Sequence, residues 1–287
     1  MVVIPDRLFN EPFIKLIHRS RQQVILEKEL SSSIFERQSY VSMYGISIVM
    51  QGQQRILEDS GKILTINPGE IGIIRKGLYT VTDILPKEKN FQSYHIFLSE
   101  QALREVLNTY GISSNQENGQ GLLKFQAPDL IKEYFIFLKT INPATAYSYQ
   151  IFTLKIMEFF GLLINENPSV AKQLAGLLHQ PFKNLQAFME DHFSKPLSIK
   201  DYASLTGRSE STFRREFKLK YGIAPRKWII NKRMEMAKKL LEDADFNVNE
   251  VAMEVGYDNV SHFIKAYKNV FGETPGNHQL TDPTILS

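Results

Sequence analysis

Four polar or basic side chains recur at helical spacing in the C-terminal third of this 287-residue chain. They are Ser211, Arg214, Arg215 and Lys218, at positions i, i+3, i+4 and i+7, which share one face of a helix. A guanidinium group can donate two hydrogen bonds to the edge of a guanine, and a cationic face attracts phosphate. The spacing therefore indicates a surface that binds nucleic acid, although an ordinary solvated helix face has the same composition.

A similar face follows about fifty residues later. It contains Ser261, Ile264, Lys265 and Lys268, with His262 at its edge. On the opposite side of each predicted helix, three aromatic residues recur at i, i+4 and i+8, which is typical of a core-facing stripe. These stripes are Phe213, Phe217 and Tyr221, and then Phe263, Tyr267 and Phe271.

Both faces belong to one pattern that occurs twice. Eight positions of residues 199–225 match positions of residues 248–275 at an offset of 49 or 50. Each copy opens on a capping-box signature, which predicts the start of a helix, and then reaches a glycine that can adopt positive φ in a turn. The signatures are Ser198-x-x-Asp201 and Asn247-x-x-Glu250, and the glycines are Gly207 and Gly256.

A short helix, a glycine turn and a second helix form the helix-turn-helix module, whose second helix lies in the major groove of DNA. Between the two copies, residues 225–244 predict one continuous helix of about 30 Å. Successive major-groove segments on one face of B-DNA are about 34 Å apart. A rigid spacer of this length suits two tandem modules that read one site.

The repeated region resembles the DNA-binding domain of the AraC/XylS family of bacterial transcription regulators. The likeness runs from Asn184 to Asn277. Three motifs carry it: Pro225-x-x-Trp228 with Arg233, Val251-Ala252-x-x-Val255-Gly256-Tyr257, and Phe271-Gly272-x-x-Pro275. The resemblance implies promoter DNA and RNA polymerase as partners, and activation more often than repression. It also implies two sets of base-reading positions: Ser211, Thr212, Arg214 and Arg215, and then Val260, Ser261, His262 and Lys265.

Positive charge is concentrated in the first copy and the connecting helix. The whole chain carries a net charge of +3, but residues 208–239 contain 11 Lys or Arg and 3 Asp or Glu, a net +8. Residues 245–273 contain 2 basic and 5 acidic residues, a net −3. We therefore expect phosphate contacts mainly from the first copy and the connecting helix, Lys218 and Lys232 among them, with Lys268 contributing in the second copy. A solubilising surface is the alternative interpretation.

Composition excludes several classes of protein. The 43% hydrophobic and 23% charged residues are ordinary for a soluble chain of two domains. No cysteine is present, which excludes disulfides, thiolate catalysis and the cysteine-dependent DNA-repair methyltransferases that carry AraC-type domains. Since no signal peptide and no stretch of about 18 apolar residues is found, we expect a cytoplasmic protein without membrane contact.

Short β-rich runs occupy residues 24–26, 44–50, 54–57, 63–66, 72–74 and 94–98. Their spacing, with turn residues between them, predicts a barrel or double-sheet roll. The stretch from Ile66 to Gly77 resembles the turn-strand-turn of a cupin, the fold that many family members carry at this end.

A metal-dependent cupin enzyme is one alternative function. Such enzymes bring several histidines and a glutamate together on one ion. Only His18 and His95 occur in this region, too far apart in sequence to form such a motif. We therefore expect no catalytic residues, no metal and no cofactor. An architectural DNA-binding protein without sequence preference is the second alternative.

The pattern becomes helical from residue 100, with helices expected at 101–110, 128–140, 144–165 and 168–179. The third is apolar nearly all round, so it must be buried on more than one side. Either the barrel and neighbouring helices cover it, or a second copy of the chain covers one side. We expect a homodimer through this helix, with contacts from Tyr147, Ile151, Leu154, Phe159 and Leu162.

The middle of the chain, with Leu154-Lys155-Ile156-x-Glu158, resembles the type III secretion activator subgroup of the family. That subgroup implies an N-terminal domain that self-associates and is regulated by protein partners, whereas other members bind a small molecule there; both possibilities stay open. The expected fold is α+β in two domains. Residues 1–180 form a cupin-like β-barrel followed by helices, and residues 181–287 form an all-α tandem helix-turn-helix domain with a long connecting helix. The expected function is that of a sequence-specific DNA-binding transcription regulator controlled through its N-terminal domain.

Overall fold

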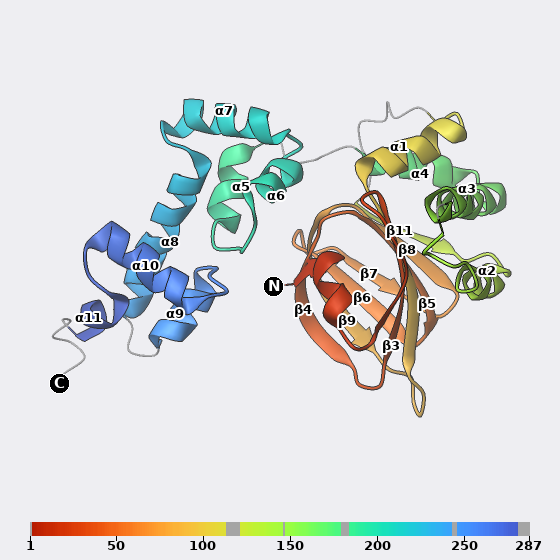
Figure 1. The fold of residues 1–287 in the computed structure, drawn as a ribbon, viewed down its shortest axis with the longest axis horizontal. Helices are drawn as coiled ribbons and strands as arrows, with labels where there is room; N and C mark the ends of the chain where they lie inside the picture. Colours follow the sequence, from red (N-terminus) through yellow and green to blue (C-terminus); the bar gives the residue numbers. More distant parts are fainter. Residues whose placement is uncertain (1, 113–120, 146, 179–183, 243–245, 281–287) are drawn as a thin grey trace. The chain divides into compact units, whose positions relative to one another are not determined.

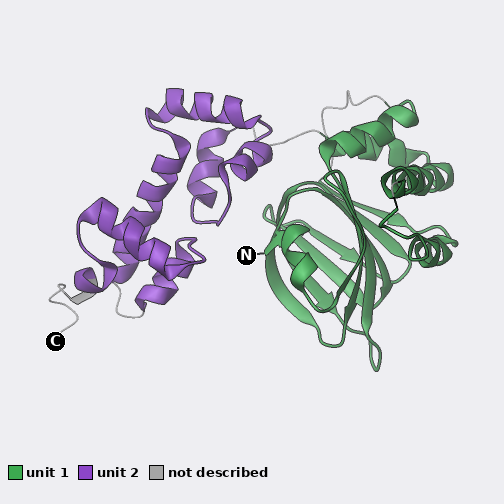
Figure 2. Ribbon diagram, viewed as in Figure 1, with its two compact units in different colours: residues 1–179 green, residues 180–287 purple. Residues whose placement is uncertain are grey.

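A computed structural model describes residues 2–112, 121–145, 147–178, 184–242 and 246–280 of the chain. The chain divides into two compact units, Met1–His179 and Gln180–Ser287 (Figure 2). The expected domain boundary, after residue 180, falls in a stretch outside the described residues. Each unit has a hydrophobic core of its own.

The N-terminal unit contains two β-sheets. The five-stranded sheet has the order β1 (Val2–Ile4), β4 (Ile34–Val41), β9 (Gly77–Ile84), β6 (Gln53–Glu58), β7 (Ile63–Ile66). The six-stranded sheet has the order β11 (Leu122–Gln126), β8 (Glu70–Ile74), β5 (Tyr44–Gln51), β10 (Phe91–Leu98), β3 (Gln23–Leu30), β2 (Ile14–Arg19). Among the described strands, β1 and β4 pair in parallel and the other pairs are antiparallel.

Both faces of the six-stranded sheet are buried. In β3, Val24 and Leu26 belong to the core shared with the other sheet, whereas Ile25 belongs to a second core beneath the helices. Alternate residues of a strand point to opposite faces, so a continuous apolar run is what such a strand requires. The helices on the outer face are α1 (Glu100–Thr109), α2 (Ile131–Leu138), α3 (Ser148–Glu166) and α4 (Ser169–Leu177) (Figure 1). This arrangement confirms the expected sheet-rich domain followed by helices.

Five described strands were not expected from the sequence: β1, β2, β4, β9 and β11. In β9, buried Tyr79 and Val81 alternate with half-buried Thr80 and Thr82, and the buried residue at 83 is an aspartate. Apolar runs mark strands buried on both faces, so a search for such runs passes over a strand with one polar face.

The C-terminal unit is helical throughout its described part. Its helices are α5 (Leu185–His192), α6 (Ile199–Leu205), α7 (Glu210–Tyr221), α8 (Pro225–Leu241), α9 (Val248–Glu254), α10 (Val260–Phe271) and α11 (Pro275–Leu280). The repeat in the sequence appears as two helix pairs of equal size, because α6 and α9 have 7 residues each and α7 and α10 have 12 each.

The connecting helix α8 has 17 residues, which corresponds to about 25 Å. We expected it to continue to residue 244, but it ends at Leu241 with Glu242 as its cap, and residues 243–245 lie outside the described part of the chain. None of the described helices is long and apolar enough to span a membrane.

Candidate nucleic-acid interface

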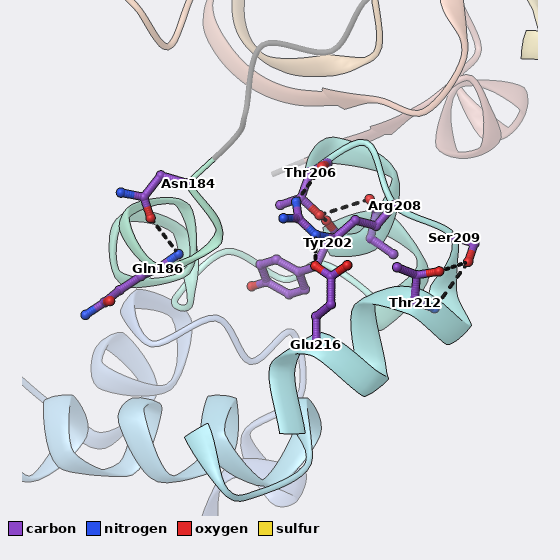
Figure 3. A network of polar contacts seen from close by, with 9 residues as sticks. Asn184, Gln186, Tyr202, Thr206, Arg208, Ser209, Thr212 and Glu216 are labelled. Atoms are coloured by element: carbon purple, nitrogen blue, oxygen red, sulfur yellow. Dashed lines mark hydrogen bonds and ion pairs between the residues drawn. The ribbon is translucent and has the colours of Figure 1, made fainter. Parts of the chain in front are cut away.

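Side-chain caps begin both helices of the first pair. Ser198 and Asp201 form the expected capping box at α6, in which the Ser198 hydroxyl accepts from the Asp201 N–H. At α7 the Ser209 hydroxyl accepts from the Thr212 N–H at 3.2 Å (Figure 3). Gly207, between the helices, has φ +71°, where a residue without Cβ is least strained. These local bonds hold α7 at a defined angle to α6.

Arg208, in the same turn, is committed to this structure. Its guanidinium donates to Glu216 of α7 at 2.7 Å and to the carbonyl of Thr206 at 2.7 Å (Figure 3). Arg208 therefore braces α7 against the end of α6 and is not offered to a ligand.

The predicted reading face of α7 is at the surface. Ser211, Arg214, Arg215 and Lys218 are exposed. Arg214 donates to Glu210 through Nε at 3.0 Å and Nη2 at 2.6 Å, whereas no hydrogen bond or ion pair joins the side chain of Arg215 or Lys218 to another described residue. The α7 face thus presents two uncommitted cations and one arginine held by an exposed ion pair.

Thr212 is less exposed than the other predicted base readers of α7. It is half-buried, and its hydroxyl accepts a hydrogen bond from Ser209 Oγ at 2.9 Å. Its hydroxyl is therefore part of the cap, and a base contact from Thr212 would rest on its methyl group or on the remaining hydrogen-bonding capacity of that hydroxyl.

The second pair repeats this geometry with fewer charges. Asn247 and Glu250 form a capping box at α9, and Asn259 accepts from the His262 N–H at 3.1 Å to cap α10. On α10 the exposed predicted residues are Ser261, His262, Lys265 and Lys268. Val260 is half-buried and packs with Ile264 against the core of this pair, so it offers only part of its surface.

A groove of about 500 Å³ in this unit is lined by two basic residues that the sequence analysis did not name individually, Lys200 and Arg226. It is lined by Arg214 of α7, by Arg226 at the start of α8, by Lys200 of α6 and by Tyr257, which follows α9. Lys200 and Arg226 are exposed, and neither forms an ion pair with another described residue. Both lie outside the repeated faces, so only the local charge count could have indicated Arg226.

Lys232, the expected phosphate contact on α8, is already paired. Its Nζ lies 3.1 Å from Glu190 of α5 and 5.4 Å from the ring centre of Trp228, and the side chain is 33% exposed. An exposed pair of this kind is worth little in water, so Glu190 reduces the attraction of Lys232 for phosphate without abolishing it.

In the N-terminal unit, three of the residues expected to mediate self-association lie at the surface. Tyr147 is 73% exposed, Leu154 69% and Ile151 37%, while Leu162 is half-buried. Phe159 is only 1% exposed and packs against Tyr134 and Phe160, so the expectation that it contacts a second copy was wrong. A helical wheel does not reveal which apolar side the chain itself covers.

Helix α2 and its N-cap residue Leu130 also expose apolar side chains. Leu130, Ile136 and Phe137 are 66%, 50% and 49% exposed. The two helices are in contact, since Lys155 Nζ of α3 lies 4.6 Å from the ring centre of Phe137. We call the exposed side chains of Leu130, Ile136, Phe137, Tyr147, Ile151 and Leu154 the α2–α3 surface.

Between the two sheets lies a buried polar cluster. Lys28 and Asp83 form an ion pair, and Gln54 Nε2 donates to Asp83 Oδ1 at 2.7 Å. Burial lowers the pKa of Lys28, with Asp83 opposing that shift. The adjoining cavity of about 40 Å³ has room for one or two water molecules.

Two buried histidines remain neutral near pH 7. Burial lowers the pKa of His95 to about 3 and that of His18, whose ring stacks on Phe152 with centroids 4.1 Å apart, to about 4. Among the described residues, no group of three or more His, Asp or Glu side chains is placed to hold a metal ion.

Two family models match the chain. Residues 202–279 match a helix-turn-helix domain, and residues 44–175 match the ExsA N-terminal regulatory domain. The first match begins within α6 and takes in α7, α8, α9 and α10, and the second takes in β5 to β11, α1 to α3 and most of α4. Fold, paired helices and family models together define a DNA-binding transcription regulator of the AraC type.

Its relatives are regulators as well. The chain is 28% identical over 238 residues to the HTH-type transcriptional regulator ExsA of Pseudomonas aeruginosa, covering 80% of this chain and 84% of that protein. It is 27% identical over 264 residues to the thermoregulatory protein LcrF of Yersinia pestis, covering 90% and 96%. A crystal structure of ToxT from Vibrio cholerae with bound unsaturated fatty acid is 12% identical, covers 93% of this chain and 98% of that chain, and has a TM-score of 0.44.

Proposed function

We propose that the chain activates transcription by placing α7 and α10 in two successive major-groove segments of promoter DNA. The observation that carries this proposal is the duplicated helix pair, with matched helix lengths, caps and glycine turns, on either side of the single helix α8. One helix pair would read one segment, and a second pair of the same build is expected to read the next. RNA polymerase is the partner to which such a bound activator would be presented.

We call the pair of helices α6 and α7 the first reader and the pair α9 and α10 the second reader, and the two contribute differently to DNA binding. Most of the exposed positive charge of the two readers lies at the first segment. It comes from three residues of α7 and one residue in the groove: Arg214, Arg215, Lys218 and Arg226. Helix α10 offers Lys265 and Lys268 in a region of net negative charge. We therefore assign most phosphate binding to the first reader and the adjoining part of α8, and mainly base selection to the second.

Control of the protein is assigned to a protein contact at the N-terminal unit. The α2–α3 surface exposes six large apolar side chains, and such patches commonly mark interaction sites. The cavity between the sheets, at about 40 Å³, is far smaller than the several hundred Å³ of a drug-sized ligand site. Self-association through the α2–α3 surface is the form of contact we propose, and a small effector bound elsewhere is the alternative.

Footprinting tests the DNA-binding proposal. Duplexes selected by the wild-type chain from a random pool should show two protected segments about one helical turn apart, both with the full chain and with residues 181–287. Lys265→Glu should remove protection from one segment only, and Arg215→Glu should weaken both, because the first reader supplies most of the affinity. Protection of a single segment by the wild-type chain would contradict two-reader binding.

Two further measurements address the alternative classes. Selected duplex should compete with random duplex at least tenfold better, which an architectural protein without sequence choice would not show. A stoichiometric metal in the purified protein would reopen the case for a cupin enzyme.

A further inference from the structure

Arg233, in the middle of α8, makes three hydrogen bonds from a nearly buried position. Its side chain is 9% exposed. Nε donates to the carbonyl of Phe193 at 2.8 Å, Nη2 to the carbonyl of Lys195 at 2.6 Å, and Nη1 to the carbonyl of Gly256 at 2.9 Å. Among the described residues no carboxylate forms an ion pair with Arg233, and all three nitrogens of its guanidinium group donate to backbone carbonyls.

Those three carbonyls belong to different readers. Phe193 and Lys195 lie in the link between α5 and α6, which belongs to the first reader, and Gly256 lies in the turn of the second. Tyr202 of α6 holds the same link, since its hydroxyl donates to the carbonyl of His192 at 2.8 Å. Arg233 therefore connects two segments: the link between α5 and α6, which Tyr202 of the first reader holds in place, and the turn between α9 and α10 in the second reader.

The two readers also meet directly, backbone to backbone, at Gly256. A Cβ added there would lie 2.0 Å from the carbonyl oxygen of Ser194, closer than any real contact. Gly256 thus meets two demands at once, a turn at φ +87° and close approach to the other reader. Gly272, at φ +84°, has nothing within 4 Å of its added Cβ, so a left-handed glycine does not by itself require the close approach found at Gly256.

We propose that Arg233 is a positioning residue that fixes the distance and rotation between α7 and α10, and thereby selects the spacing between the two DNA segments that this regulator accepts. The inference rests on the proposed two-reader binding. Each helix pair packs on α8, through Phe217 against Trp228 in the first and through Phe263 and Tyr267 beside Met234 in the second. The guanidinium fork and the Gly256–Ser194 approach add contacts away from the axis of α8, which fix the relative rotation of the two pairs. Each base pair inserted between the segments rotates the second by about 34° and moves it by about 3.4 Å, so a rigid pair of readers distinguishes such sites.

The experiment measures affinity across a spacing series. The selected duplex is altered by −1, +1 and +2 base pairs between its two protected segments, and binding of the full chain is measured on each. Wild type should lose at least tenfold in affinity at +2 base pairs. Arg233→Leu and Gly256→Ala should lose no more than threefold at +2, because their readers can move apart, while binding a duplex with only the first segment as wild type does.

Two further variants separate positioning from stability. Gly272→Ala introduces the same left-handed strain without a clash and should keep the wild-type spacing profile. Arg233→Lys keeps the charge but loses the planar fork, so it should relax the spacing preference even if Arg233→Leu does not fold. Circular dichroism and thermal unfolding identify variants that have simply become unstable.

The outcomes are distinct. If folded Arg233→Lys and Gly256→Ala keep the wild-type profile, Arg233 has no positioning role. If wild type protects two segments but tolerates +2 base pairs without loss, the readers are not rigidly joined and the inference fails. If wild type protects one segment only, the proposed two-reader function fails instead.

Discussion

Removing the Arg214 side chain tests whether α7 reads bases. A bidentate arginine–guanine pair contributes about 1–3 kcal/mol of discrimination. To make it, Arg214 must leave Glu210, which it contacts at 2.6 Å, and an exposed i,i+4 pair of this kind is worth about 0.3–0.5 kcal/mol. The net loss for Arg214→Ala is therefore about 0.5–2.7 kcal/mol, which corresponds to about a 2- to 90-fold increase in Kd.

The ion pair with Glu210 supplies a control for this estimate. Glu210→Gln frees Arg214 without removing it and should tighten binding about twofold, and this gain should vanish in the Arg214→Ala background. The assay is fluorescence anisotropy on the selected duplex and on variants with each base pair of the first segment changed. If Arg214→Ala weakens all duplexes equally and changes the salt slope by about 0.9, Arg214 contacts phosphate and the assignment to bases is wrong.

Three other predictions follow from the charge distribution and from burial. Binding isotherms at several salt concentrations give the slope of log affinity against log salt. Arg226→Ala should reduce this slope by about 0.9, Lys232→Ala should reduce it by less because Lys232 pairs with Glu190, and Lys265→Ala should mainly alter base preference. A larger slope change for Lys265→Ala than for Arg226→Ala would show that the phosphate contacts have been assigned to the wrong helix pair. Leu154→Glu should make a self-associating chain monomeric in sedimentation at tens of micromolar with unchanged circular dichroism, and a wild-type chain that is already monomeric there would end the self-association proposal. Below pH 6.5 histidine binds a proton in the unfolded chain, whereas His18 and His95 stay neutral in the folded chain. Each of the two histidines should therefore lower the free energy of unfolding by on the order of 2 kcal/mol between pH 7 and pH 5. In denaturant titrations of the N-terminal unit, His18→Leu should halve the combined loss, and an unchanged loss would show that His18 does not contribute to it.

The C-terminal unit could be predicted closely because its signals are local. A capping box such as Ser198-x-x-Asp201 satisfies amides within one turn of its own helix, and both expected boxes are present. Gly222 and Gly272 end α7 and α10 in the left-handed conformation directly after each aromatic stripe, which is another local signal for a helix end. Duplication strengthened the prediction, because each copy tested the interpretation of the other.

The N-terminal unit was harder to predict because its structure depends on long-range pairing. Asp83 reads as a turn or surface residue, yet it is fully buried because Lys28, 55 residues away, and Gln54 supply its partners. Phe159 shows the same limit on a helix. Periodicity shows that it is apolar, but only the fold shows that Tyr134 and Phe160 already cover it.

Arg233 lies between these two cases. The sequence shows that Arg233 fits the family pattern and that Gly256 lies in a turn. No local sequence signal predicts that the helix residue Arg233 bonds to a turn 23 positions later. The two readers share a backbone plan and differ in charge, so the plan alone would allow each to bind as an independent module. The backbone carbonyls that bond to Arg233 join the two modules. Because the joined modules keep a fixed separation, the protein can select DNA by the spacing between its two segments.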